Sequence, residues 1–412
     1  MTSEQTATRR VVVCGLRGDQ APWDLPASIF EARPWIHGGE RSLYALAIAI
    51  AATGRDVELR GGLVSTELDP MVRAAGGRGP RVNLPPRRPT AEDLVIVPDG
   101  WTDPLAYARI CLSPARLVMM LLAPPGLFGW PFQSGWTRSD PTSAALEELA
   151  TADSFRAMEV LGFELWSNNE RLANAASSAG IDCEWVGSGL PTQLPEPGHK
   201  TYDVALVEAN RWAPLARAVA AKLNGVSILR IPEVDNEELL RLLGQARILI
   251  WPSRVEGHSR IQSEARAMGT VPVALPNPFG VGLTAEEGAM VVSSLEEMPG
   301  AIEWLLADPV KLGNLAALGV RTARSQLDWE RFVARVGAAL NKPKRQDPGR
   351  SARGEFGRVL EPHMDLRHEL ESARKQRDAA LSELAAFREQ RSIRWAFWIA
   401  NSLRRWTGIH RN

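Results

Sequence analysis

The chain of 412 residues is poor in cysteine, and it carries no net charge. Its 3 cysteines, Cys14, Cys111 and Cys183, are far apart and odd in number. This distribution excludes a disulfide framework and the paired spacing of a zinc site, and it fits a reducing compartment. The 48 basic and 48 acidic residues balance, so no global charge favours a polyanion, and we expect no nucleic-acid partner.

Long apolar runs are also lacking, so we expect no membrane-spanning segment. Residues 1–8 are polar, and the apolar stretch 11–14 is too short for the core of a signal peptide. These features predict a cytoplasmic protein. Hydrophobic residues make up 45% of the chain and charged residues 23%, which are ordinary values for a globular protein. The length suffices for two domains and an appendage.

Short apolar strands alternate with helical segments, a pattern typical of parallel, doubly wound α/β sheets. We expect a first set of strands at 10–14, 57–59, 94–97, 117–122 and 165–167. After a linker rich in Pro and Gly at 187–200, we expect a second set at 204–207, 226–231, 247–251 and 271–275. The predicted parts are two α/β domains, 1–190 and 191–326, then an amphipathic helix packing on the core at 327–340, a basic flexible linker at 341–362, a charged helix at 363–390 and a basic aromatic tail at 391–412.

Two carboxylates, Glu256 and Glu264, lie between the last two expected strands. Glu264 falls on a short helix that opens near Ser259, a good N-cap residue, and stops at Gly269, a typical residue just past a helix end. Strand, loop, helix and strand form one βαβ unit, whose loop opens at the sheet edge where ligands bind. Two glutamates at this spacing are usually solvated surface residues, but their setting between two apolar strands favours a functional site.

The segment from Glu256 to Glu264 resembles the E-x7-E signature of nucleotide-sugar-dependent glycosyltransferases of the GT-B fold, most closely the retaining family 4 type. Other segments support the resemblance: Gly38-Gly39-Glu40 before a helix, Trp166-Ser167-Asn168-Asn169, Gly187-Ser188-Gly189-Leu190-Pro191, and Ala307-Asp308-Pro309. Together they cover most of the chain before residue 341. The resemblance implies two Rossmann-like domains facing a central cleft, followed by a C-terminal helical appendage.

The resemblance also implies roles for these residues. Glu256 would be the catalytic residue that holds hydroxyls of the donor sugar, and Glu264 would hold the ribose diol, since a carboxylate accepts strong hydrogen bonds from hydroxyls. The diphosphate needs N–H donors, which helix starts and glycine-rich turns supply. The candidate donor-binding residues are Glu264, Gly257, His258, Ser259, Gly38, Gly39, Arg211, Gly280, Val281 and Gly282.

Several alternatives stay open at this point. His258 is either a pocket residue or a satisfied loop histidine, and Arg254, Arg260 or Arg211 could supply a cation to the diphosphate. No D-x-D motif occurs, which is consistent with a metal-independent reaction, and we expect no metal and no cofactor besides the donor itself. The family's usual lysine after the position of Arg211 is missing, and the second domain is one βα unit short between Leu223 and Val226.

The C-terminal segments predict an attachment function. Residues 366–387 are dense in charge and carry a rough three-four apolar spacing that indicates a coiled coil, interrupted at Arg377. In 391–412, arginines mix with tryptophans, which is typical of a helix in a membrane interface, although an oligomerisation helix has the same pattern. We therefore expect 363–412 to meet a membrane surface or an assembly partner, with the protein peripheral on the inner face of the membrane.

The sequence thus predicts a glycosyltransferase that moves a hexose-type sugar from a nucleotide-diphosphate donor to a hydroxyl of a glycan or lipid-linked acceptor, in cell-surface polysaccharide assembly. The acceptor would meet the first domain at Asp99-Gly100-Trp101 and the loop 124–135. Two alternatives remain: a non-catalytic glycosyltransferase-like partner that organises such an assembly, and a sugar-nucleotide epimerase of the same fold.

Overall fold

The computed structural model forms two units, Met1–Gly357 and Arg358–Asn412. The residues it describes are 10–15, 38–60, 68–82, 87–99, 107, 110–122, 155, 158–191, 194–210, 212–253, 257–277, 279–343, 376–377 and 379. The expected coiled coil at 363–390, except for these last three residues, and the tail at 391–412 lie outside this set. Within the described part of the chain, no helix combines the length and the apolar character needed to cross a bilayer.

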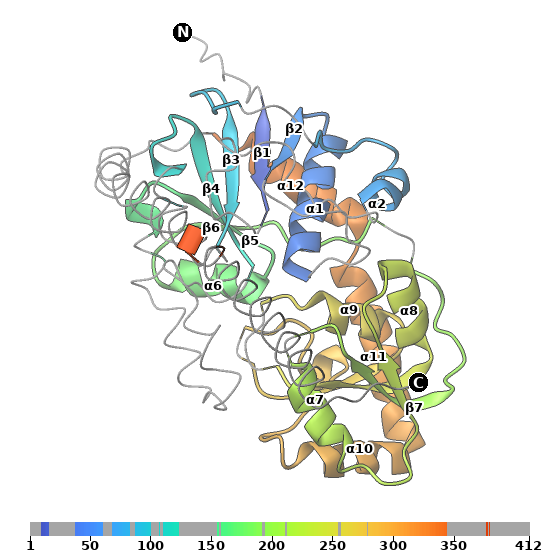
Figure 1. Ribbon diagram of the computed structural model, residues 1–412. Coiled ribbons are helices and arrows are strands. Elements are labelled where there is room, and N and C mark those ends of the chain that lie inside the picture. Colours follow the sequence, from blue (N-terminus) through green and yellow to red (C-terminus); the bar gives the residue numbers. More distant parts are fainter. Residues whose placement is uncertain are drawn as a thin grey trace, which may run out of the picture. The chain divides into compact units, whose positions relative to one another are not determined.

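The first domain is built on a six-stranded parallel sheet of order β2-β1-β3-β4-β5-β6 (Figure 1). Its strands are β1 (Val11–Cys14), β2 (Val57–Arg60), β3 (Leu94–Pro98), β4 (Arg116–Leu121), β5 (Glu164–Ser167) and β6 (Cys183–Trp185). Its helices include α1 (Gly38–Ala52), α2 (Leu68–Ala74) and α6 (Glu170–Ser178). Both faces of the central strands are buried, which explains why these strands are continuous apolar runs rather than alternating ones.

The second domain is built on a five-stranded parallel sheet of order β11-β10-β9-β7-β8. Its strands are β7 (Tyr202–Val207), β8 (Ile228–Ile231), β9 (Ala246–Trp251), β10 (Val271–Ala274) and β11 (Met290–Val291). Its helices are α7 (Ala213–Ala220), α8 (Asn236–Gly244), α9 (Arg260–Ala267), the 3-10 turn η3 (Ala285–Glu287), α10 (Met298–Ala307) and α11 (Pro309–Gln326). Strand β8 pairs with one side of β7, and the next strand along the chain, β9, pairs with the other side. The chain therefore changes direction across the sheet between β7 and β9, and open α/β sheets bind ligands at such topological switch points.

Helix α12 (Trp329–Asn341) follows the second domain in sequence but packs on the first. Its apolar stripe, which includes Phe332 and Val336, belongs to the same core as α1 and the first sheet, and Figure 1 shows α12 beside α1. The helix begins at Asp328, whose side chain accepts a hydrogen bond from the backbone N–H of Arg331 at 2.8 Å. The chain therefore crosses between the two sheets twice.

The expected fold class is confirmed, because two parallel, doubly wound sheets follow one another along the chain. The start of β8 differs from the expected strand 226–231. Ser227 instead donates two hydrogen bonds to the carboxylate of Asp203, one from its backbone N–H at 3.0 Å and one from its hydroxyl at 2.8 Å. These side-chain bonds form a link between the ends of β7 and β8 before the strand ladder begins at Ile228.

Candidate functional site

Helix α9 is the central element of the site, and its eight residues are all buried although four of them are charged or amide side chains. Ser259 occupies the N-cap position in an extended conformation, without a side-chain capping bond. Gly269 ends the helical segment with a φ of +70°, which a side chain would disfavour. Burial of so many polar side chains on one short helix requires partners on several sides. These partners come from both domains.

Glu264 faces the first domain. Its side chain is 0% exposed, and Oε1 lies 3.4 Å from Nη1 of Arg41 on α1 and 4.0 Å from Nε of Arg260. The second oxygen, Oε2, is buried and has no hydrogen-bond partner among the described residues. Leaving a buried carboxylate oxygen unsatisfied is costly, so Oε2 marks Glu264 as a candidate ligand-binding position.

The first turn of α1 meets the first turn of α9. A Cβ atom added at Gly38 would lie 3.7 Å from the Cβ of Arg260, which is ordinary van der Waals contact. Arg260 in turn donates from Nη1 to Ser188 Oγ at 2.9 Å and to the carbonyl oxygen of Gly189 at 3.0 Å. The structure therefore brings Gly38 and Gly39, at the start of α1, to the same junction as Glu264.

His258 links the two domains through its ring. Nε2 lies 3.1 Å from Ser263 Oγ, and the ring also hydrogen-bonds to the backbone of Asn168 at the end of β5. Burial, together with the charges of Arg260 and Arg266, lowers the pKa of His258 from its ordinary value to about 3, so the ring is neutral. Protein groups from both domains engage this ring, which fits the alternative of a satisfied loop histidine; donor contact by His258 stays a prediction.

The loop 280–282 lies against both domains. The backbone N–H of Val281 donates to the carbonyl oxygen of Gly257 at 3.3 Å, and that of Gly280 donates to Asn277 at 3.1 Å. Gly282 has a φ of +78°, and an added Cβ would lie 1.9 Å from Nη2 of Arg266. Two of the three amides expected to bind a diphosphate therefore donate to carbonyl oxygens of the protein. The third position, Gly282, must be a glycine because the guanidinium of Arg266 leaves no room for a side chain.

Helix α6 of the first domain holds the same loop from the other side. The amide of Asn169 donates to the carbonyl oxygen of Phe279, and the guanidinium of Arg171 donates to that of Gly280. Arg171 also forms an ion pair with Glu287 at 2.8 Å. Asn169 caps α6 through its side-chain oxygen at the same time, with 2.8 Å to the backbone N–H of Arg171.

Two expected site residues, Glu256 and Arg211, lie outside the described residues, as does Arg254. Their neighbours are described: Gly257 and Ser259 are buried and flank His258 directly before α9. The structure therefore brings Gly257, His258, Ser259 and Glu264 together with the start of α1 and the loop 280–282. The placement of the catalytic carboxylate stays a prediction.

The expected acceptor residue Asp99 is 1% exposed, and its Oδ1 accepts a hydrogen bond from the backbone N–H of Leu122 at 3.1 Å. That bond ties the ends of β3 and β4 together. Gly100, Trp101 and the loop 124–135 lie outside the described residues.

Residues that sequence reasoning did not select also belong to this junction. Arg41 and Arg171 come from the first domain, and each reaches a residue more than 100 positions away in the second. A usable signal for Arg41 was present in the sequence: it is one of two charged residues in α1, and both lie in the first turn of an otherwise apolar helix. A charge at the start of an apolar helix indicates that this end faces polar partners.

The neutral state of His258 predicts how the protein responds to acid. The pKa of His258 is about 3 in the folded protein, below the ordinary value of 6.5. Between pH 3 and pH 6.5 the ring is therefore protonated in the unfolded chain and neutral in the folded one. Stability from this group is complete above pH 6.5 and is lost as the pH falls, by about 2 kcal/mol at pH 5. The thermal unfolding midpoint at pH 7.5 and pH 5 should therefore differ less in His258→Gln than in the wild type.

The matched control for this measurement is His199→Gln, because His199 is exposed on the segment before β7. This variant should keep the full pH dependence of the wild type. An identical pH dependence in His258→Gln and the wild type would contradict the buried, neutral ring.

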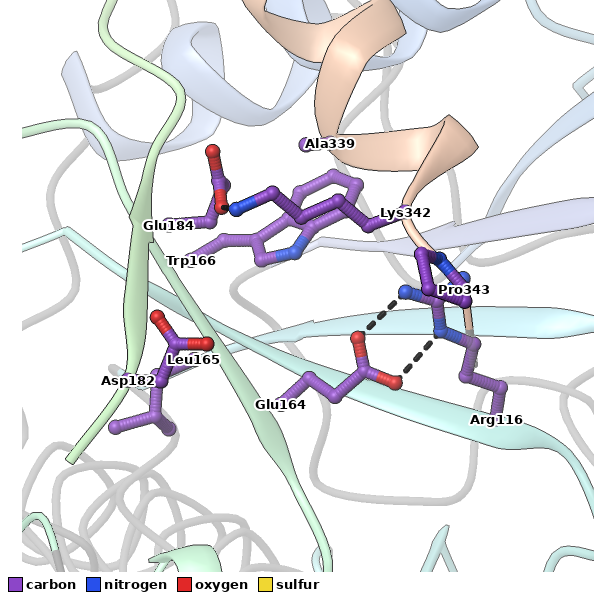
Figure 2. Close-up of a pocket in the computed structure, with 9 residues that line it drawn as sticks. All are labelled: Arg116, Glu164, Leu165, Trp166, Asp182, Glu184, Ala339, Lys342 and Pro343. Carbon is purple, nitrogen blue, oxygen red and sulfur yellow. Dashed lines mark hydrogen bonds and ion pairs between the residues drawn. The ribbon is translucent and has the colours of Figure 1, made fainter. Parts of the chain in front are cut away.

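A small pocket at the other edge of the first sheet is not part of this junction (Figure 2). Arg116 and Glu164 begin β4 and β5 and pair there, with 2.7 Å between Arg116 Nε and Glu164 Oε1, while Lys342 pairs with Glu184. The cavity volume is about 50 Å³. This is enough for a few waters, whereas pockets for drug-sized ligands measure about 300–1,000 Å³. The pocket lies at the amino ends of the strands, and its paired charges have a structural role.

Comparison with known proteins agrees with this architecture. Neither a protein-family model nor a curated protein sequence matches the chain. Among solved structures, the chain is similar to sucrose-phosphate synthase from Thermosynechococcus elongatus, with a TM-score of 0.53 and 12% identity over 81% of this chain and 98% of that chain. It is also similar to HepE of Anabaena in complex with UDP-glucose, with a TM-score of 0.51 and 12% identity over 80% of this chain and 99% of that chain. At such identities the likeness establishes the fold, and the expected GT-B architecture is confirmed.

Proposed function

We propose that the protein is a glycosyltransferase that moves a sugar from a nucleotide-diphosphate donor to a hydroxyl of a glycan or lipid-linked acceptor. The observation that carries the proposal is the carboxylate of Glu264, fully buried on α9 with Oε2 unpartnered among the described residues. A carboxylate oxygen accepts hydrogen bonds, and a hydroxyl of a bound ligand can supply the one that Oε2 lacks. The GT-B fold raises the expectation of such a ligand by analogy alone.

In this proposal, Glu264 accepts hydrogen bonds from the ribose diol, and Glu256 accepts them from the donor sugar. The start of α1, at Gly38 and Gly39, offers backbone N–H groups and the positive end of a helix of 15 residues to the diphosphate. Charge that develops on the leaving diphosphate as the glycosidic bond breaks is stabilised there. Gly257, Ser259, Arg211 and the loop 280–282 complete the donor site, and the reaction retains the anomeric configuration without a metal.

The first donors to test are UDP-sugars, because HepE, which shares this fold, is in complex with UDP-glucose. The full-length protein should be incubated with UDP-, GDP- and ADP-sugars while nucleoside diphosphate release and thermal stability are followed. A matching nucleotide at 100 times its Kd contributes about 2.7 kcal/mol and should raise the unfolding midpoint by several degrees. Glu264→Gln should weaken this effect, and Glu238→Gln on the exposed face of α8 should not.

A second candidate function is a non-catalytic partner of the same fold, which organises an assembly through 363–412. The observation that favours it is the loop 280–282, where the amides of Gly280 and Val281 already bond to protein carbonyls. Nucleotide binding without release or transfer of sugar from any donor would favour this candidate. Absence of both binding and turnover would reject the donor site itself. Docking of 391–412 on the inner face of a membrane is part of either proposal.

A further inference from the structure

Arg41 lies where the two domains meet, although it belongs to the first domain and the residue it pairs with belongs to the second. It occupies the first turn of α1, three residues after Gly38. Gly38 packs on Arg260, which begins α9, so the first turns of the two helices are in contact. A guanidinium extending from this turn of α1 reaches the polar residues of α9 without crossing solvent, because both Arg41 and Glu264 are buried.

The geometry divides the carboxylate of Glu264 into two unlike oxygens. Oε1 lies 3.4 Å from Nη1 of Arg41 and 4.0 Å from Nε of Arg260, so two cations face it. Oε2 has no hydrogen-bond partner among the described residues. The exposed fraction is 2% for the side chain of Arg41 and 0% for that of Glu264, so water screens this pair weakly. A cation that donates to one carboxylate oxygen in such a setting fixes the orientation of the whole carboxylate.

We infer that Arg41 is a positioning residue for nucleotide recognition: by holding Oε1 of Glu264 from the opposite domain, it keeps Oε2 aimed at a ribose hydroxyl of the donor. This inference rests on the proposed function and deepens it. It assigns to the first domain a part in reading the nucleoside, although the residue that contacts the ribose lies on the second. Ribose recognition then depends on contact between the domains as well as on α9.

Lysine is not equivalent to arginine at this position. The guanidinium offers several donors in a planar fork, so Arg41 can contact Oε1 through Nη1 while its other N–H groups serve other partners. An ammonium group offers one compact charge on a flexible stem, which keeps the charge but orients the carboxylate less well. Arg41→Lys should therefore retain part of the effect, and Arg41→Gln should remove it.

The test compares ribose with deoxyribose. Isothermal titration of the full-length protein with UDP, ADP and GDP identifies the nucleotide, and the same titration with its 2′-deoxy and 3′-deoxy forms measures how strongly the ribose diol is read. A hydrogen bond to a charged group corresponds to about a tenfold or greater preference for the ribose form in the wild type. Arg41→Gln should lower the affinity for the ribose nucleotide, so that the preference falls toward onefold. Its affinity for the deoxy form that lacks the recognised hydroxyl should stay nearly the same as that of the wild type.

Arg116→Gln is the matched control, because it also removes a largely buried arginine from an ion pair in the first domain, with Glu164 at the other edge of the sheet. It should leave the ribose preference unchanged. The double variant Arg41→Gln/Glu264→Gln should show no further loss beyond Glu264→Gln, since both act on one hydrogen bond. If Arg41→Gln fails to fold, Arg41→Lys replaces it in the test, and its preference for the ribose over the deoxy nucleotide should lie between onefold and the wild-type value.

The outcomes separate the inference from the proposed function. If Arg41→Gln lowers the affinities for the ribose and deoxyribose nucleotides by the same factor, Arg41 supports the fold only and the inference is overturned. The same conclusion follows if the wild type binds nucleotide but ignores both sugar hydroxyls. If the wild type binds none of the three nucleotides, the proposed function fails before Arg41 is tested.

Discussion

Glu264→Ala is expected to lower the free energy of unfolding by about 3–5 kcal/mol, because it removes the acid from a buried ion pair. Arg41, with a side chain 2% exposed, and Arg260, at 0%, would both lose the carboxylate that faces them. Removing one charge of a buried pair leaves the other charge desolvated, which accounts for most of the cost. Urea unfolding followed by tryptophan fluorescence measures the change as a lower transition midpoint.

Glu238→Ala is the matched control, since Glu238 forms an ion pair with Arg241 on the exposed side of α8. Exposed pairs of this kind contribute little, so its urea midpoint should match that of the wild type. Glu264→Gln should fall between the two, because the amide keeps the shape and one acceptor oxygen. A Glu264→Ala midpoint equal to the wild-type midpoint would mean that the contact between α1 and α9 does not form in solution.

The boundaries of α9 were predictable from residue type, although Ser259 makes no side-chain capping bond. Ser259 precedes the helix and Gly269 follows it with a positive φ, as the sequence predicted from residue type alone. The two sheets were predictable for a similar reason: strands such as β4 and β9 are short apolar runs bounded by loop residues, and a parallel sheet buries both faces of such runs. The short edge strands β6 and β11 were not expected, since three and two residues carry no measurable period.

The partner of Glu264 was not predictable in the same way. Arg41 and Glu264 are 223 positions apart, and no local pattern states which turn of α1 meets α9. Arg260 illustrates the same limit. Among the cations considered for the diphosphate it is the one the structure describes, yet its Nη1 bonds to Ser188 and Gly189 at the end of the first domain. Long-range packing decided both contacts.

The loop 280–282 shows how one residue pattern can serve two purposes. Glycines in a loop after a strand are expected where a backbone approaches phosphate, which is why the sequence predicted a diphosphate contact. In the structure, Gly282 accommodates the guanidinium of Arg266, whose Nη1 donates to the carbonyl oxygen of Glu287 at 2.9 Å. The glycine is therefore required by packing, whether or not a phosphate also binds there, and the expected phosphate contact stays a prediction.

Glu256→Gln is expected to reduce sugar transfer without reducing the affinity for the nucleoside diphosphate. The amide keeps the size of the side chain but loses the charge that would bind the donor's sugar hydroxyls. A hydrogen bond to a charged group contributes about 1.5–3 kcal/mol, so kcat/KM for the matching sugar nucleotide should fall about 10- to 100-fold. Rates of nucleotide release from the sugar nucleotide, together with titration by the nucleotide alone, measure both quantities on the same preparation.

Glu264→Gln provides the contrast, because the carboxylate of Glu264 is assigned to the ribose rather than to the sugar that is transferred. Glu264→Gln should lower the affinity for the nucleotide and for the sugar nucleotide by the same factor. Glu256→Gln should impair only the binding and use of the sugar nucleotide. Equal losses in both variants would place the two carboxylates on the same part of the donor and reject the division of roles. Unchanged transfer by Glu256→Gln would remove Glu256 from the site and, with it, the catalytic meaning of the seven-residue spacing between the two glutamates.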